Sequence, residues 1–136
     1  MTRICLDSNV LVAAFVARGL CADLLKLVIS EYYLVVPEVV AEEVRRVLST
    51  KIKASPAALS AMEAVLERCD IVPQGDSPSP ISIRDPDDER VLAGALAADA
   101  DILVSGDQDL LVVADQSPIR ILSPRAFLAL ARGGTP

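Results

Sequence analysis

Short apolar runs alternate along the chain with longer stretches whose apolar residues fall at helical spacing. A continuous apolar run is typical of a strand buried on both faces of a parallel sheet. The runs predict strands at residues 2–7, 34–36, 71–72, 102–105 and 119–122. The other stretches predict helices at residues 9–17, 20–30, 37–48, 55–69, 85–98 and 107–113, and from 123 to the Gly133-Gly134 pair. Because strands and helices alternate, we expect an α/β fold with a mainly parallel sheet, helices on both faces and right-handed crossovers.

Prolines mark the starts of several predicted helices. Pro37 is expected at the first helical position, where its missing N–H would have had no partner in any case. The same signal, preceded by a residue that can cap a helix, occurs at Ser55-Pro56, Asp85-Pro86 and Ser123-Pro124. Residues 73–80 are rich in Pro, Ser and Gly, so we expect a surface connection there.

Two of the apolar runs end on an aspartate. Ile4-Cys5-Leu6 leads into Asp7, and Ile102-Leu103-Val104-Ser105-Gly106 leads into Asp107. In open α/β sheets the ligand lies at the carboxyl ends of the strands, so both acids are expected at that edge. Carboxylates that gather there raise one another's pKa unless a cation lies between them, and a hard divalent cation suits oxygen ligands. Each aspartate could also be a simple helix cap.

Helix periodicity adds two further acids. In the helix after Pro37, Glu43 falls in the sector that holds the valines, whereas Glu42 points to the opposite side. A glutamate at the rim of that sector could instead extend to water. In the helix after Asp85, Asp88 lies near the centre of the apolar face, and the other acids of the first turn favour the helix dipole. Four acids at two strand ends and on two inner helix faces favour a shared cation over independent caps.

The amino-acid composition excludes several kinds of catalytic and metal site. Since the 136 residues include no histidine, Ser-His-Asp and Cys-His catalysis and mixed His zinc sites are excluded. The three cysteines, Cys5, Cys21 and Cys69, are expected to be buried, reduced thiols. A chain of this length is expected to form a single domain over residues 1–136, because domains commonly contain roughly 100–150 residues.

The net charge and the hydropathy of the chain indicate whether it binds nucleic acid or a membrane and in which compartment it is expected. A net charge of −6 argues against bulk electrostatic adhesion to nucleic acid, although bound cations would change the local field. Candidate phosphate contacts, which could equally be solvated surface charges, are Arg3, Arg45, Arg46, Lys51, Lys53 and Arg84. No apolar stretch approaches the roughly 18 residues of a membrane span, and Asp7 and Asn9 interrupt any signal-like segment. We therefore expect a cytoplasmic protein with no membrane partner.

Four motifs together resemble PIN domains. They are Asp7-Ser8-Asn9-Val10, the segment Val36-Pro37-Glu38-Val39-Val40-Ala41-Glu42-Glu43-Val44, Asp85-Pro86-Asp87-Asp88, and Ser105-Gly106-Asp107-Gln108-Asp109-Leu110-Leu111. Their order and spacing cover nearly the whole chain. The likeness is greatest to stand-alone prokaryotic proteins described as toxin components, relatives of the VapC-type toxins.

This resemblance implies a three-layer α/β/α fold and a ribonuclease that uses Mg²⁺ or Mn²⁺. Position by position, the resemblance assigns the catalytic metal ligands to Asp7, Glu43, Asp88 and Asp107. It implies that Asn9 orients the first aspartate, that the Ser105 hydroxyl holds hydrogen bonds of the site, and that Asp109 is an accessory acid. Asp85 is the chief rival of Asp88 as the third ligand.

The resemblance also implies partners: an RNA substrate, a second copy of the chain in a homodimer, and an antitoxin of a type II toxin-antitoxin system. An apolar groove on the helices between residues 20 and 69 could serve either protein partner. The alternative function is a non-catalytic PIN-fold module that binds RNA or protein. Two phosphotransfer folds fit less well, because a haloacid-dehalogenase phosphatase needs an aspartate where Asn9 stands, and a receiver domain needs a lysine after Lys53.

Overall fold

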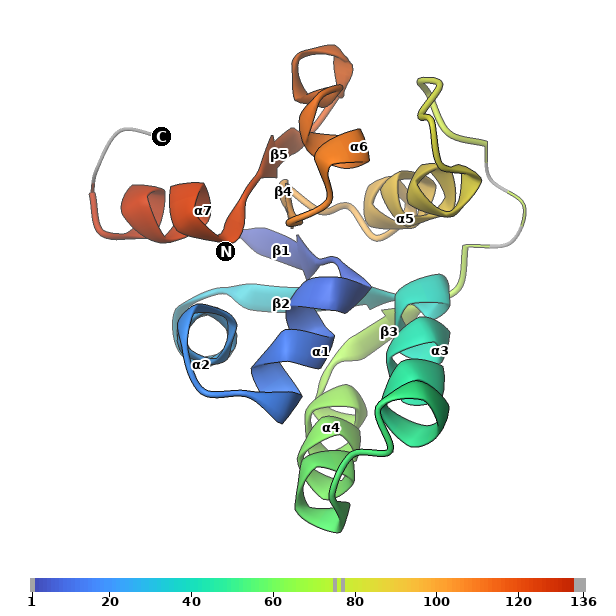
Figure 1. Cartoon of the computed structure of the whole chain (residues 1–136). Helices are drawn as coiled ribbons and strands as arrows, with labels where there is room; N and C mark the ends of the chain where they lie inside the picture. The colour runs from blue at the N-terminus through green and yellow to red at the C-terminus, as the bar shows by residue number, and fades with distance from the viewer. Residues whose placement is uncertain (1, 75, 77, 134–136) are drawn as a thin grey trace.

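The computed structural model describes residues 2–74, 76 and 78–133, and it contains a five-stranded sheet in which every neighbouring pair is parallel. The strand order is β3-β2-β1-β4-β5. The strands are β1 (Arg3–Leu6), β2 (Tyr33–Pro37), β3 (Asp70–Val72), β4 (Ile102–Val104) and β5 (Arg120–Leu122). Figure 1 shows β1 at the centre, so the chain builds the sheet outward in one direction and then in the other. The predicted parallel sheet is confirmed.

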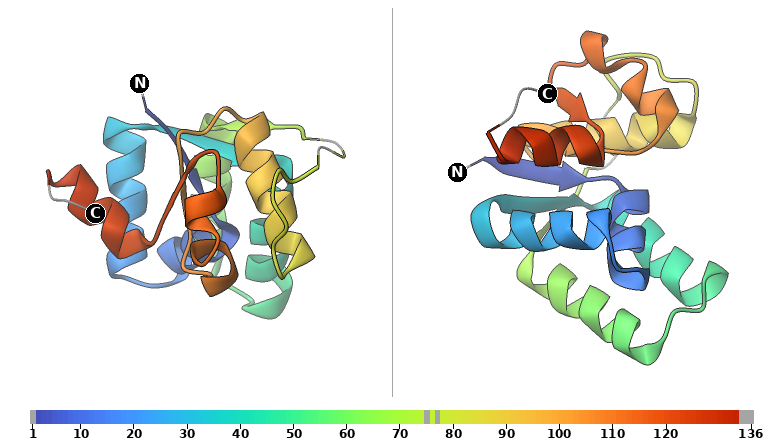
Figure 2. Two further views of the ribbon diagram at one scale, coloured as in Figure 1. Left: turned by 90° about the horizontal axis from the view of Figure 1, so that it is seen from above. Right: turned by 60° about the vertical axis from the view of Figure 1, so that its left-hand side comes forward.

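Within the described residues, seven α-helices connect and cover the strands. They are α1 (Ser8–Val16), α2 (Leu20–Glu31), α3 (Glu38–Arg46), α4 (Pro56–Arg68), α5 (Pro86–Ala97), α6 (Gln108–Leu111) and α7 (Pro124–Ala131). Helices α2 and α5 both contact β2, and the views in Figures 1 and 2 place them on opposite sides of the sheet. The fold is therefore the expected α/β arrangement with helical layers on both faces. In the described part of the chain, no helix has the length and apolar character needed to cross a bilayer.

The core is aliphatic and lies against the three central strands. Residues of β1, β2 and β4 are almost wholly buried, whereas β3 and β5 at the edges are partly exposed. Phe127 is a fully buried aromatic residue of the core and packs edge-on against Tyr32. The cysteines are free thiols, as expected, but only Cys5 is fully buried, because Cys21 and Cys69 lie on the outer layer of the packing.

Several element boundaries differ from the prediction. Pro37 is the last residue of β2, with extended backbone and a partner in Val72, so α3 begins one residue later. The predicted helix at 37–48 is also divided, because its α-helical part ends at Arg46 and a π-helical turn, Val47–Lys51, follows. The predicted helix at 107–113 is shorter, and a 3-10 turn at Ala114–Gln116 follows it.

Parts of two predictions fall outside the described residues. In the predicted connection at 73–80, Gly75 and Ser77 are outside the described residues, as is Gly134 at the predicted end of the last helix. Gly133 has a positive φ of 84° just after α7, a conformation that glycine adopts without strain.

Candidate functional site

Asp7 and Asp107 follow two strands that pair directly, β1 and β4, and each begins a helix. Asp7 Oδ1 accepts a hydrogen bond from the Ser8 N–H at 2.8 Å, and Asp107 Oδ1 accepts one from the Asp109 N–H at 2.9 Å. Both acids are therefore helix caps. A carboxylate has two oxygens, however, so a capping aspartate still has a second oxygen for another contact.

Ser105 connects these two acids. Its fully buried hydroxyl donates a hydrogen bond to Asp7 Oδ2 at 2.7 Å and accepts one from the Asp107 N–H at 3.0 Å. The hydroxyl thus fixes the Asp7 carboxylate relative to the start of α6. Asp7 itself is only 3% exposed, and burial raises its pKa, an effect that the hydrogen bonds from Ser105 and Ser8 partly oppose.

Asp88 is the acid whose environment is least favourable to a bare charge. It lies on α5, is 5% exposed, and its Oδ2 is buried with no hydrogen-bond partner among the described residues. Burial, which is the largest cause, and the adjacent negative charge of Asp107 together raise the pKa of Asp88 to about 7. Leaving a buried oxygen unpaired is costly, so this side chain is suited to an additional ligand.

Asp85, Asp88 and Asp107 form the tightest group of acids. One carboxylate oxygen from each lies within 4.8 Å of the others. Opposite oxygens around an octahedral Mg²⁺ are about 4.2 Å apart, so this spacing is close to that of a cation site. The ligands are all carboxylate oxygens, which Mg²⁺ and Mn²⁺ prefer over the nitrogen and sulfur ligands typical of zinc. These residues therefore fit a hard divalent cation.

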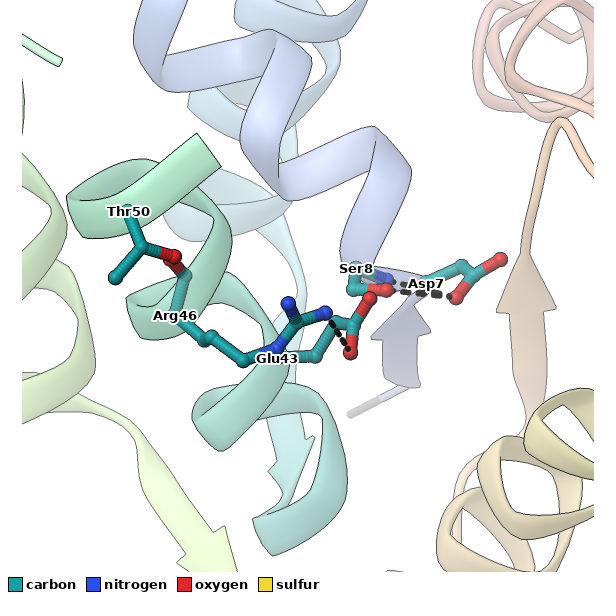
Figure 3. A network of polar contacts seen from close by, with 5 residues as sticks. All are labelled: Asp7, Ser8, Glu43, Arg46 and Thr50. Atoms are coloured by element: carbon teal, nitrogen blue, oxygen red, sulfur yellow. Dashed lines mark hydrogen bonds and ion pairs between the residues drawn. The ribbon is translucent and has the colours of Figure 1, made fainter. Parts of the chain in front are cut away.

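Asp7 and Glu43 lie around this group rather than within it. Both line the cleft of about 160 Å³ that also contains Asp85, Asp88 and Asp107. Glu43 comes from α3, and Arg46 turns back onto it with an ion pair of 3.2 Å, as Figure 3 shows. The neighbouring Glu42 is exposed and is not part of the cleft. The structure thus brings the four predicted acids into one cleft, together with Asp85.

Comparison with known proteins identifies the family. The family model for the PIN domain matches residues 3–109, a range that contains every acid of the cleft. The chain belongs to the PIN-domain family. A search of curated proteins finds no match.

The PIN fold is also seen in a solved structure. The protein is similar to a chain in the crystal structure of VapBC2 from Rickettsia felis bound to a DNA fragment from their promoter. The TM-score is 0.62 at 18% sequence identity, and the match covers 89% of this chain and 97% of that chain. At this identity, the likeness shows a common fold.

Two polar residues of the PIN motifs have positions that the sequence did not indicate. Asn9 is exposed and lines the cleft, but within the described residues it forms no hydrogen bond with Asp7. Ser8 and Ser105 hold that carboxylate instead. Asp109 contributes its backbone N–H to Asp107, and its side chain is not among those that line the cleft. The interaction of Ser8 was missed, although its place directly after a capping aspartate was a usable signal.

The basic residues of this PIN domain differ in whether they line the acidic cleft. Arg3 cannot contact a ligand in the cleft, because it lies at the opposite end of β1, donates to the Ala98 carbonyl and covers the Tyr33 ring. Arg45 pairs with Glu63 at 3.0 Å. Lys51, Lys53 and Arg84 do not line the cleft, whereas Arg90, which the sequence analysis did not consider, does.

Proposed function

We propose that this PIN domain is a metal-dependent endoribonuclease that hydrolyses RNA phosphodiester bonds with Mg²⁺ or Mn²⁺. The observation that carries the proposal is the buried, unpartnered Oδ2 of Asp88 in an all-carboxylate cleft. Structural acids normally have hydrogen-bond partners, so this oxygen needs a ligand that supplies positive charge. In this proposal, Asp7, Glu43, Asp88 and Asp107 hold the ion.

The side chains of the cleft would each have a defined part in that chemistry. Ser105 and Ser8 keep the Asp7 carboxylate oriented before any ligand arrives. Asp107 is held through its capping bond, which leaves its second oxygen for the ion. A divalent ion bound here would lower the pKa of a bound water and offset negative charge on the phosphate.

Asp85 competes with Asp88 for the place of third ligand. Each has a carboxylate oxygen within 4.8 Å of one from Asp107, but their other contacts differ. Asp85 Oδ1 accepts a hydrogen bond from the Asp87 N–H at 2.9 Å, whereas Asp88 has the unpartnered oxygen. We therefore place Asp88 in direct contact with the ion. Asp85 and Asn9, which line the cleft, and Asp109, whose backbone N–H holds Asp107, are assigned supporting positions.

The biological setting that we propose is the toxin of a type II toxin-antitoxin system, as a homodimer with a cognate antitoxin. The PIN motifs and the fold shared with a chain of the VapBC2 structure support it. A groove of about 410 Å³ near α2 and α4, lined in part by Ile29, Tyr32 and Val65, offers apolar surface to a protein partner. Growth arrest on expression, relieved by the product of a neighbouring reading frame, is the expected result.

The test of the nuclease compares the wild type with Asp7→Asn in a metal titration. Purified proteins are incubated with a pool of structured RNAs while Mn²⁺ or Mg²⁺ is added, with a chelator as the blank. The wild type should cleave only with metal, and Asp7→Asn should not cleave although its melting temperature is retained. Glu42→Gln is the matched control, because it removes an exposed charge beside the cleft. Metal binding and RNA binding without cleavage in the wild type would favour the non-catalytic module.

A further inference from the structure

The cleft holds more negative charge than one divalent ion can offset. Six carboxylates line it: Asp7, Glu43, Asp85, Asp87, Asp88 and Asp107. With one ion bound, the cleft would still present a negative field to an approaching phosphodiester. A nuclease that uses this cleft therefore needs cationic side chains at its rim to hold the substrate.

Two arginines lie close to acids of the cleft, and they differ in what they bind. Arg46 is paired with Glu43, so its charge is already engaged within the protein. Arg90 lines the cleft itself, is exposed, and forms no ion pair with any acid of the described residues. Because no acid of the described residues pairs with it, the guanidinium group of Arg90 leaves its N–H donors available to a ligand at the cleft.

The backbone that carries Arg90 is fixed in place. Gln74 donates its Nε2–H to the Arg90 carbonyl at 2.8 Å, and Val91, the next residue, is buried in the core. Asp88 lies two positions earlier on the same helix and points into the acidic cluster. Arg90 is thus held at the mouth of the cleft, beside the carboxylates proposed to bind the ion.

We propose that Arg90 is a substrate-binding residue that contacts a backbone phosphate of the RNA strand next to the bond to be cleaved. This inference rests on the proposed nuclease function. The guanidinium group presents paired N–H donors that match two phosphate oxygens, which a lysine ammonium cannot reproduce. Contacts to phosphate carry no sequence information, so Arg90 sets affinity for RNA rather than the cleavage sequence.

The test measures RNA binding apart from cleavage. A short, labelled, single-stranded RNA is titrated in a fluorescence anisotropy assay over a series of salt concentrations, in the Asp7→Asn background so that it stays intact. Arg90→Gln should weaken binding about tenfold, since one charge-assisted contact is lost. It should also reduce the slope of log affinity against log salt by about 0.7, the value for one phosphate on a single strand.

Two further variants separate a specific contact from a change in net charge. Arg125→Gln removes the same charge from an exposed position on α7 and should leave affinity and slope unchanged. Arg90→Lys keeps the charge but loses the paired donors, so it should keep the slope and bind with intermediate affinity. Mn²⁺ affinity, measured by calorimetry with otherwise wild-type protein, should be no weaker in Arg90→Gln.

The outcomes distinguish this inference from the proposed function. Three results would overturn the role of Arg90. The first is equal RNA binding by Arg90→Gln and Arg125→Gln, and the second is absence of RNA binding by the Asp7→Asn protein that carries neither change. The third is loss of Mn²⁺ binding in Arg90→Gln. Asp7-dependent cleavage could still hold in each of these cases. Conversely, Arg90-dependent RNA binding with no metal-dependent cleavage by the wild type would support the contact and contradict the nuclease.

Discussion

The Ser105 hydroxyl, at the end of β4, donates a 2.7 Å hydrogen bond to Asp7 Oδ2, at the end of β1. The two residues are 98 positions apart in the sequence and both are buried. The bond gives the first acid of the cleft a fixed orientation that depends on correct pairing of the two central strands. The geometry of the acidic cleft is therefore a product of the sheet.

Ser105→Ala should weaken Mn²⁺ binding and cleavage by about tenfold, because loss of a residue that orients a ligand typically costs 10–100-fold. The measurements are calorimetry for the metal and an RNA cleavage assay. Ser30→Ala, which removes an exposed hydroxyl that bonds only to the Leu27 carbonyl, is the control. Unchanged metal affinity in Ser105→Ala would show that Asp7 needs no such support.

Glu42→Gln and Glu43→Gln form a matched pair on α3. Glu43 lines the cleft and Glu42 is exposed outside it, so the same chemical change is made at two adjacent positions. We expect Glu43→Gln to reduce metal-dependent cleavage more than tenfold, and Glu42→Gln to change it less than twofold, as for metal ligands and surface charges respectively. Equal activities of the two variants would remove Glu43 from the ligand set.

The stability of the metal-free protein should depend on pH through Asp88. Its pKa is raised in the folded state to about 7, so the folded protein binds more protons than the unfolded chain between the ordinary aspartate value and that pH. The contribution of Asp88 to stability is therefore complete below its pKa in the unfolded chain, and it is lost as the pH rises from that value to about 7. The melting temperature in chelator should decrease from about pH 4 to pH 7.

Asp88→Asn removes the group responsible for that pH dependence. The variant should have a flatter profile of melting temperature against pH and a higher melting temperature than the wild type at pH 7 in chelator. Added Mn²⁺ should stabilise the wild type, since a ligand that binds the folded state raises its stability, and should have little effect on the variant. A wild-type profile that rises with pH would contradict the assigned origin of the effect.

Gly94 has a structural role at the contact between α5 and β2. A Cβ added there would lie 2.6 Å from the Pro37 Cβ and 2.5 Å from Gln74 Oε1. Gly94→Ala should therefore destabilise the fold by about 1–3 kcal/mol, as overpacking does, despite the higher helix propensity of alanine. Gly106→Ala, where no atom lies within 4 Å of the added Cβ, is the control in denaturant unfolding.

Structural features that follow from the pattern of apolar residues within one strand or helix could be predicted from the sequence. The central strands are continuous apolar runs because both faces are covered, so the parallel sheet and the place of Asp7 and Asp107 at its carboxyl edge could be derived. The inward direction of Asp88 on α5 followed from helix periodicity alone. These conclusions depend only on neighbours within one element.

Features that depend on contacts between elements could not be derived in this way. Pro37 satisfies the local rule for a helix start, but its pairing with Val72 keeps it in the sheet. The position of Asp85 beside Asp107 depends on how α5 is packed relative to β4. Whether Arg90 lines the cleft depends on the same packing. No periodicity within one helix contains that information.

The central claim is that Asp88 and its neighbours bind a divalent cation. A crystal soaked in Mn²⁺ and measured at the manganese absorption edge tests it most directly, because anomalous density locates the ion itself. We predict a peak in the cleft within coordination distance of Asp88 Oδ2 and Asp107, with Asp7 and Glu43 around it. A cleft without anomalous density at saturating Mn²⁺, in crystals grown above pH 7, would contradict the account.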